Sequence, residues 1–257
     1  MTAEFLSDPA LADLPHAFFT RQGGVSTGRF ATLNCSLSGR DDAEAVARNR
    51  ALAMDAIGLR PDSLSGLFQV HGPAVVRVSS PFPLDARPQA DAMVTDRPGV
   101  TLGIVTADCG PILFADAEAG VVGAAHAGWR GAVAGVLEST IDAMEELGAE
   151  RARIAAVVGP CIRQPSYEVG PDMRDAALAA SRDAARFFAP GARPDRWMFD
   201  LAGYCAARLS AAGAGTVSVV DADTLLAEDR FFSYRRNTLS GGGGPIGHQL
   251  SAIALPR

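Results

Sequence analysis

Three residues of types that bind metals or act as nucleophiles each lie beside a strongly apolar run. Cys109 and His126 follow such runs, and His71 lies in the same kind of setting upstream. A catalytic zinc ion typically takes three protein ligands from His and Cys and leaves its fourth position open. The residue types therefore favour the hypothesis that His71, Cys109 and His126 meet around one small pocket and hold a metal ion.

The same residues fit two other interpretations. In one, Cys109 is a nucleophile without a metal, His126 or His71 is its base, and Asp108 orients that base. In the other, Cys109 is a small buried apolar residue and both histidines are satisfied core or loop residues. The candidates lie 38 and 17 positions apart (71 to 109 and 109 to 126), too far for a local metal motif, so spacing does not decide between them.

The composition limits the classes of protein. A chain of 257 residues with 48% hydrophobic content can bury a large core, and we expect one domain over residues 1–257. The net charge of −6 is scattered along the chain, which argues against a nucleic-acid partner. Without an export signal or an apolar run of roughly 18 residues, we expect a cytoplasmic protein with no membrane partner. The four cysteines are widely separated, which favours thiols over disulfides.

All 23 basic residues are arginines. The absence of lysine excludes Schiff-base chemistry and a Walker-type phosphate loop, whereas arginine can hold phosphate through two parallel hydrogen bonds. Arg21 opens the glycine-rich segment 21–28, which favours close approach of a ligand to the backbone, or else a plain hairpin. Arg48 lies on a predicted helix, where arginines usually face solvent. Asn49 falls on the apolar face of that helix and needs a buried partner.

The hydrophobic pattern predicts the elements that position these residues. Near-continuous apolar runs predict strands of a sheet covered on both faces, over 99–106, 112–115 and 119–125. Further strands are predicted over 15–20 (an edge strand), 65–70, 74–79, 90–95, 153–158, 216–220, 231–236 (an edge strand) and 249–255. Helices are predicted over 43–57, 131–147, 171–188 and 201–212. The mixed order of strands and helices predicts an α+β layered sandwich.

Five ordered motifs resemble the YfiH family. This family has been labelled laccase-domain or multicopper polyphenol oxidase and was later described as a purine nucleoside phosphorylase family. The motifs are QVHG at 69–72, TADCGPI at 106–112, HAGWRG at 126–131, GPCI at 159–162 and FFSYRR at 231–236. The resemblance runs from Arg21 to the last predicted strand. It implies a layered α/β/β/α sandwich with mixed sheets, related to the catalytic domain of cytotoxic necrotizing factor.

The resemblance also implies a metal site and a set of reactions. The implied metal is zinc, or copper in some members, on His71, Cys109 and His126. The implied reactions are phosphorolysis of adenosine, inosine or methylthioadenosine and deamination of adenosine, so the expected partners are purine nucleosides and phosphate. We expect catalytic roles for Cys109, His126, His71 and Asp108. Phosphate contacts are expected from three arginines, and sugar or base contacts from polar residues: Arg21, Arg48 and Arg130, and Asn49, Gln69 and Asp108.

Three other functions remain open. The fold relation favours a cysteine-dependent amidase that uses Cys109 to edit peptidoglycan precursors. A four-copper oxidase needs about ten histidines, whereas this chain has four and no His-x-His pair. A polyphenol oxidase with a single copper ion remains compatible with the sequence. The third alternative is a metal-binding protein without catalytic activity. The sequence does not predict the oligomeric state.

Overall fold

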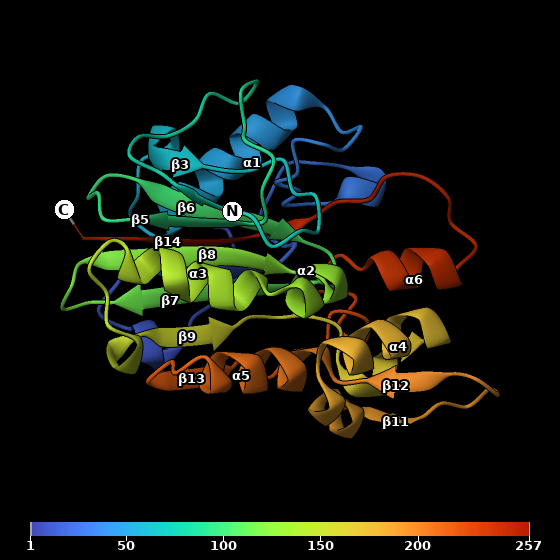
Figure 1. Ribbon diagram of the computed structural model, residues 1–257. Helices are drawn as coiled ribbons and strands as arrows, with labels where there is room; N and C mark the ends of the chain where they lie inside the picture. Colours follow the sequence, from blue (N-terminus) through green and yellow to red (C-terminus); the bar gives the residue numbers. More distant parts are fainter. Residues whose placement is uncertain (1, 257) are drawn as a thin grey trace.

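The computed structural model describes residues 2–256 as four stacked layers in the order helix, sheet, sheet, helix (Figure 1). The first large sheet has the strand order β1-β2-β14-β6-β3, and the second has the order β13-β9-β7-β8-β5-β4. Both sheets contain parallel and antiparallel pairs. The predicted α+β sandwich of the α/β/β/α type with mixed sheets is therefore confirmed. The assignment of 1–257 to one domain stays a prediction.

The strand bounds follow the predicted apolar runs. The first sheet contains β1 (Phe5–Leu6), β2 (His16–Phe19), β3 (Leu64–Ser65), β6 (Thr101–Thr106) and β14 (Gln249–Ala254). The second contains β4 (Val75–Arg77), β5 (Ala92–Thr95), β7 (Gly110–Asp116), β8 (Val121–Ala127), β9 (Ala155–Val158) and β13 (Thr216–Val219). A small third sheet has the order β10 (Glu168–Val169), β12 (Trp197–Phe199) and β11 (Phe188–Pro190).

Six α-helices are formed within residues 2–256. They are α1 (Ala43–Ala56), α2 (Trp129–Ala134), α3 (Val136–Glu145), α4 (Pro171–Ala180), α5 (Leu201–Ala211) and α6 (Tyr234–Leu239). Figure 1 shows α1 on one side of the stack and α3 and α5 on the other, with α4 and α6 at the end where β8 leads into α2. None of these helices has the length and apolar run that crossing a membrane requires.

Strand β7 explains why the two large sheets stack. Side chains alternate in direction along a strand, so Leu113 lies in the apolar layer between the sheets with Phe18 and Ile253. Its neighbours Ile112 and Phe114 point the other way, into the cluster that includes α3 and α5 residues. On the outer face of the first sheet, a separate cluster joins α1 to β2 and β14. Each large side chain that is fully buried contributes roughly 1.5–3 kcal/mol to stability.

Two helix predictions differ from the structure in extent. The helix predicted over 131–147 is divided into α2 and α3 by Gly135, whose φ of 98° is left-handed and ends α2. The helix predicted over 171–188 ends at Ala180. Ser181 is extended there, and a 3-10 helix and β11 follow. Helix α1 begins as predicted, because the Asp42 carboxylate accepts the Ala45 amide hydrogen at 2.9 Å.

Three strand predictions were wrong in extent or type. Of the predicted strand 65–70, Ser65 alone lies in a strand, where it pairs with Leu102 of β6, and Phe68 forms an isolated bridge with Gln89. Strand β2 is not an edge strand, since β1 covers its free side. The predicted edge strand 231–236 instead enters helix α6, whose start is capped by the Ser233 hydroxyl accepting the Arg236 amide at 3.1 Å.

Candidate metal and nucleophile site

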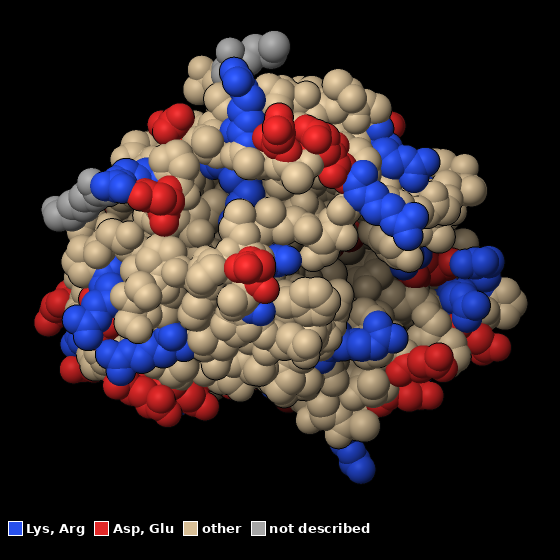
Figure 2. Space-filling model, turned by 90° about the horizontal axis from the view of Figure 1, so that it is seen from above, with Lys and Arg blue, Asp and Glu red and all other residues tan. Residues whose placement is uncertain are grey.

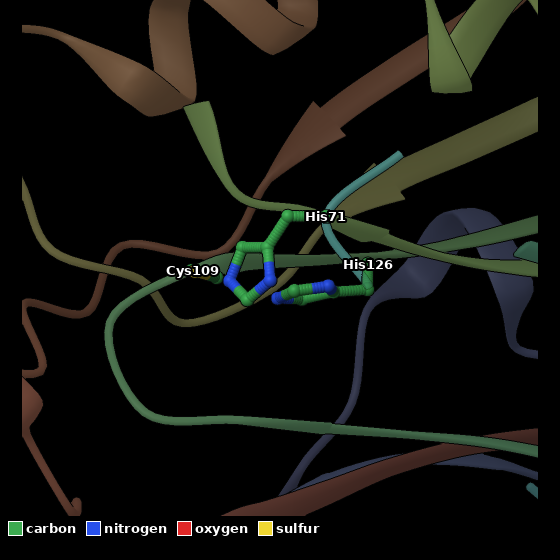
Figure 3. Close-up of side chains that lie close together, drawn as sticks. All are labelled: His71, Cys109 and His126. Atoms are coloured by element: carbon green, nitrogen blue, oxygen red, sulfur yellow. The ribbon is translucent and has the colours of Figure 1, made fainter. Parts of the chain in front are cut away.

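The three candidate side chains lie at the same end of the second sheet (Figure 3). Cys109 directly precedes β7, and His126 is the penultimate residue of β8, where it pairs with Pro111. His71 lies on the turn that leads into β4. The imidazole and thiol ligand atoms of these residues all lie within 4.8 Å of one another. The structure therefore confirms that His71, Cys109 and His126 meet.

The two imidazole rings stand edge to face, with centroids 4.7 Å apart and an interplanar angle of 79°. His71 is exposed, Cys109 is partly exposed, and His126 has only 3% of its surface accessible. Gly128 leaves space for this arrangement. A Cβ atom at position 128 would lie 2.9 Å from His71 Cδ2 and 3.0 Å from Cys109 Sγ, closer than such atoms normally approach.

Two residues of the site adopt a left-handed backbone conformation that residues other than glycine rarely adopt. His71 has a φ of 62° and Asp108 a φ of 88°. Such conformations cost on the order of 1–3 kcal/mol and persist only where surrounding contacts hold them. In this site the contacts are hydrogen bonds to two buried carboxylates, Asp91 and Asp108.

The Asp91 carboxylate is the central acceptor of the site. It accepts the His126 Nδ1 hydrogen at 2.7 Å and the backbone amide hydrogens of Val70, His71 and Gly72 at 2.8–3.0 Å. Burial raises the pKa of Asp91, but the hydrogen bonds from His126 and the turn amides outweigh that effect, so the pKa lies below its ordinary value. Asp91 is therefore ionised although it is fully buried.

Asp108 has a different role from the one predicted. Its carboxylate accepts the Thr224 hydroxyl at 2.7 Å, the Ser233 hydroxyl at 3.0 Å and the Arg235 amide at 2.6 Å. The prediction that Asp108 orients the histidine base is therefore corrected, because Asp91 is the carboxylate that hydrogen-bonds His126. Asp108 connects the Cys109 turn to the start of α6. Burial raises its pKa despite these hydrogen bonds.

The Cys109 thiol and the His126 imidazole form a coupled pair. Burial raises the pKa of the thiol, but the charge of His126 and hydrogen bonds with both histidines outweigh this effect and lower the pKa to about 6. Burial lowers the pKa of His126, whereas Cys109 and Asp91 raise it to about 9. Near neutral pH the metal-free pair is therefore a thiolate and an imidazolium.

The donor set fits a divalent transition-metal ion. Tetrahedral zinc with Zn–N of about 2.1 Å and Zn–S of about 2.3 Å places its ligand atoms about 3.4–3.7 Å apart. The ligand atoms of His71, Cys109 and His126 need only small movements to reach these separations, since none of them is more than 4.8 Å from another. A thiol with a lowered pKa readily supplies the thiolate, which is the species that binds metal.

Two of the predicted substrate residues are held by their own chain. The Asn49 side chain is fully buried in α1, where its amide nitrogen donates to Ser26, Thr32 and Asn34 and its oxygen accepts the Val25 amide. Asn49 thereby has the buried partners that its position required, and it fixes the glycine-rich loop.

The Arg21 guanidinium donates to the carbonyls of Ala31 and Glu228 and lies over the Phe232 ring, with 4.5 Å from Cζ to the ring centroid. Burial and the charge of Arg236 lower the pKa of Arg21. Arg21 thus joins three segments at the end of β2.

The other predicted substrate residues differ in their exposure and in their contacts within the chain. Gln69 is partly buried, and its amide exchanges two hydrogen bonds with the Val105 backbone. Arg48 is exposed on α1. Arg130 is exposed at the start of α2 and stacks on the Trp129 ring at 4.4 Å, with no ion pair to an acid within residues 2–256. Figure 2 shows arginine side chains around a hollow in the upper face, toward the side on which α6 lies in Figure 1.

The sequence pattern failed to single out three residues near the site. Asp91 lies within the predicted strand 90–95, where a lone acid between apolar residues requires a buried partner. Arg235 lies over the Tyr167 ring, with 5.3 Å from Cζ to the centroid, and the charges of Cys109 and Arg130 also act on the Tyr167 hydroxyl. Burial raises the pKa of Tyr167, so its hydroxyl is neutral.

The fold and this site define a class of layered α+β proteins with one His-Cys-His centre at the ends of two antiparallel strands. Residues 15–256 match the family model described as multi-copper polyphenol oxidoreductase laccase, and the chain belongs to this family. It is 43% identical to a Deinococcus radiodurans protein named purine nucleoside phosphorylase, over 98% of this chain and 93% of the relative.

Solved structures of related proteins show the same architecture. A Neisseria meningitidis protein of family DUF152 has a TM-score of 0.87 and 35% identity, with both chains covered completely. The YfiH protein of Bacillus licheniformis, titled hypothetical, has a TM-score of 0.87 and 28% identity over 95% of this chain and 93% of its own. The predicted resemblance to the YfiH family is therefore confirmed.

Proposed function

We propose that this chain catalyses the phosphorolysis of purine nucleosides in the pocket around His71, Cys109 and His126. The observation that carries the proposal is the convergence of one cysteine sulfur and two imidazoles in a chain whose relatives bear the name purine nucleoside phosphorylase. Deamination of adenosine and phosphorolysis of methylthioadenosine are proposed as further reactions of the same pocket. Zinc is proposed as the metal, with copper as the alternative.

Phosphorolysis exchanges one bond for another at C1′ of the ribose. A phosphate oxygen forms a bond to C1′, the bond from C1′ to the purine nitrogen breaks, and the purine leaves with the electron pair and takes up a proton. Arg130 is the best placed phosphate ligand, because its guanidinium is exposed and, among residues 2–256, has the Trp129 ring but no acid as its partner. Arg48 and Arg21 stay proposed phosphate contacts and Gln69 a proposed sugar or base contact, whereas the side chains of Asn49 and Asp108 are already held by hydrogen bonds within the chain.

Deamination would use the same groups differently. Water adds to C6 of adenine and ammonia leaves, a reaction that zinc deaminases share. A zinc ion on His71, Cys109 and His126 would supply Lewis acidity for this step. Asp91 holds the Nδ1 hydrogen of His126 and so leaves Nε2 of this ring to face the pocket. In phosphorolysis, by contrast, the neutral hydroxyl of Tyr167 would be the donor of a hydrogen bond to the departing purine.

The reaction can be read directly from its products. Purified protein is incubated with adenosine, with and without phosphate, and adenine, inosine and hypoxanthine are separated by chromatography. We expect adenine only in the presence of phosphate, and inosine with or without it. A Cys109→Ser variant serves as the control for a contaminating enzyme. If wild-type and variant protein form equal amounts of product, or if neither forms any, the proposal is wrong.

The second candidate is a cysteine amidase that acts on peptidoglycan precursors. The ordered contacts of Cys109, His126 and Asp91 favour it, because a thiolate, an imidazole and an orienting carboxylate are the parts of a cysteine nucleophile. A chelator separates the two candidates. The phosphorylase–deaminase activity is expected to fall on chelation and return with zinc, whereas an amidase would survive chelation and be lost on alkylation.

Two weaker alternatives have outcomes of their own. Oxidation of a phenol that depends on added copper would support a mononuclear copper oxidase; the family description names polyphenol oxidation, but by a multi-copper protein. The four histidines of the chain are too few for a four-copper centre, which needs about ten. Tight zinc binding without turnover of nucleosides, phenols or cell-wall precursors would identify a metal-binding protein without catalytic activity.

A further inference from the structure

We propose that Asp91 is the positioning residue of this site: one buried carboxylate sets both histidines for a divalent metal ion. The inference rests on the metal site of the proposed function but on neither of its reactions. Asp91 lies immediately before β5, the strand that pairs with β8. From there it reaches the His126 ring and the His71 turn at once.

The first half of the inference concerns the His126 ring. Its Nδ1 lies 2.7 Å from Asp91 Oδ1, and an ionised carboxylate can only accept a hydrogen bond. The hydrogen of the neutral ring is therefore on Nδ1, which leaves the Nε2 lone pair for a metal ion. The His126 backbone amide also donates to the Asp91 carbonyl at 2.7 Å, so backbone and side chain are fixed by the same residue.

The second half concerns the turn that carries His71. Three successive amides, of Val70, His71 and Gly72, donate to the two oxygens of Asp91 at 3.0, 2.9 and 2.8 Å. These bonds hold His71 in its left-handed conformation, which few residues other than glycine adopt. Asp91 Oδ1 serves both the His71 amide and the His126 ring. The two metal-binding histidines are thus connected through one atom.

A purely structural carboxylate in the same sheet provides the comparison. Asp116 ends β7 at the opposite end from Cys109 and is also fully buried. It accepts the amide hydrogens of Ala119 at 3.1 Å and Glu150 at 2.9 Å and pairs with Arg153 at 3.0 Å. Asp116 and Asp91 share burial, charge and backbone partners, but only Asp91 contacts the histidines.

The experiment compares Asp91→Asn with Asp116→Asn in the full chain. The affinity for zinc alone is measured by competition with a chromophoric chelator, and thermal unfolding of the metal-free proteins reports the structural cost. We expect D91N to weaken zinc binding by about 10–100-fold, the usual effect of losing such a partner of a metal-bound histidine. We expect D116N and D91N to lower the Tm of the metal-free protein by similar amounts. Zinc binding by D116N should nevertheless stay within about twofold of wild type.

Wild-type zinc affinity in D91N, or an equal loss in D116N, overturns the inference. Should D91N fail to fold, Asp91→Glu keeps the charge but moves it by one methylene group, and it too is expected to weaken zinc binding; unchanged affinity overturns the inference. Absence of zinc binding by the wild-type protein removes the metal site and this inference together. Absence of nucleoside turnover by a zinc-loaded wild-type protein removes only the proposed reaction.

Discussion

At the scale of single residues, the cysteines show how surroundings decide chemistry. Cys35 and Cys161 are fully buried, and burial raises the pKa of each to about 12. Burial also raises the pKa of Cys205 well above its ordinary value. Cys109 is partly exposed and lies against two imidazoles, which bring its pKa down to about 6. One of four chemically identical side chains is thereby reactive.

This contrast predicts selective alkylation of Cys109. In the metal-free protein at pH 7 we expect iodoacetamide to modify Cys109 alone, because it is mainly a thiolate while the other thiols stay protonated and buried. The rate should rise with pH and reach half its maximum near pH 6. Intact mass measures the rate of modification, and peptide mapping identifies the modified cysteine.

Two controls test the cause of this reactivity. Saturating zinc is expected to protect Cys109, and His126→Ala is expected to move the midpoint upward by at least one pH unit, toward the ordinary thiol pKa of about 8.5. Modification of Cys161 at the same rate would contradict the prediction.

The residue types of the site were predictable, but their contacts were not. His71, Cys109 and His126 could be singled out because imidazoles and a thiol at strand ends are chemically conspicuous. For Asp91 the apolar neighbours indicated only that a buried partner was needed, since its partners come from a turn and another strand. For Asn49 the buried apolar face indicated that a partner was needed, but its four contacts come from a loop that no periodic pattern describes.

At the scale of elements, the junction between β8 and α2 shapes the site. Gly128 is the N-cap of α2 and has an ordinary φ of −67°, so its conformation suits any residue. Gly128 matters because it places no side chain between His71 and Cys109. The neighbouring Gly110, at the start of β7, differs in this respect, because a Cβ there would contact nothing closer than 3.5 Å.

The two glycines give a matched pair of substitutions. Gly128→Ala is expected to push His71 and Cys109 apart and to weaken zinc binding by at least tenfold, since a methyl group would lie 2.9 Å and 3.0 Å from them. Gly110→Ala should keep zinc affinity within about twofold, with a change in stability of about 1 kcal/mol or less. Chelator competition and thermal unfolding provide the two measurements. Equal zinc affinities in both variants would contradict this account of the junction.

Elements with a clear hydrophobic period were predicted well, and those ruled by local polar contacts were not. The apolar runs that became β6, β7 and β8 and the cap of α1 were found from sequence because burial and capping leave a pattern. The segment 231–236 has aromatic residues that favour a strand. Its actual course is set by the Ser233 cap and by Asp108, which lies 125 positions away in the chain. No local window contains that information.

At the scale of the whole molecule, buried carboxylates connect stability to pH. Burial raises the pKa of Asp116, but Arg153 and the amides of Glu150 and Ala119 outweigh it and hold the pKa below the ordinary value of 3.8. A carboxyl that releases its proton more readily when folded adds stability above its unfolded pKa. That contribution is lost as the pH falls through the folded value.

Asp116→Asn is therefore expected to flatten the acid side of the stability profile. At pH 7 the variant should unfold more easily by about 1–3 kcal/mol, the range for hydrogen bonds to a charged group. Between pH 5 and pH 2.5 wild type should lose more stability than the variant, because only wild type has this carboxylate to protonate. Urea unfolding of the metal-free proteins at several pH values measures the difference. Parallel curves for the two proteins would show that Asp116 does not contribute to acid sensitivity.

The graded exposure of the three ligands gives the centre a direction. His71 is exposed, Cys109 is partly exposed and His126 is buried, so an ion bound here would be expected to meet His71 first and His126 last. Loading and retention are then governed by different imidazoles: we expect His71→Ala to slow zinc capture in stopped-flow mixing, and His126→Ala mainly to hasten its escape. Equal effects of both substitutions on capture would mean that the ion enters by another route. If the centre holds a metal ion, this order of exposure would separate the residue that captures the ion from the residue that retains it.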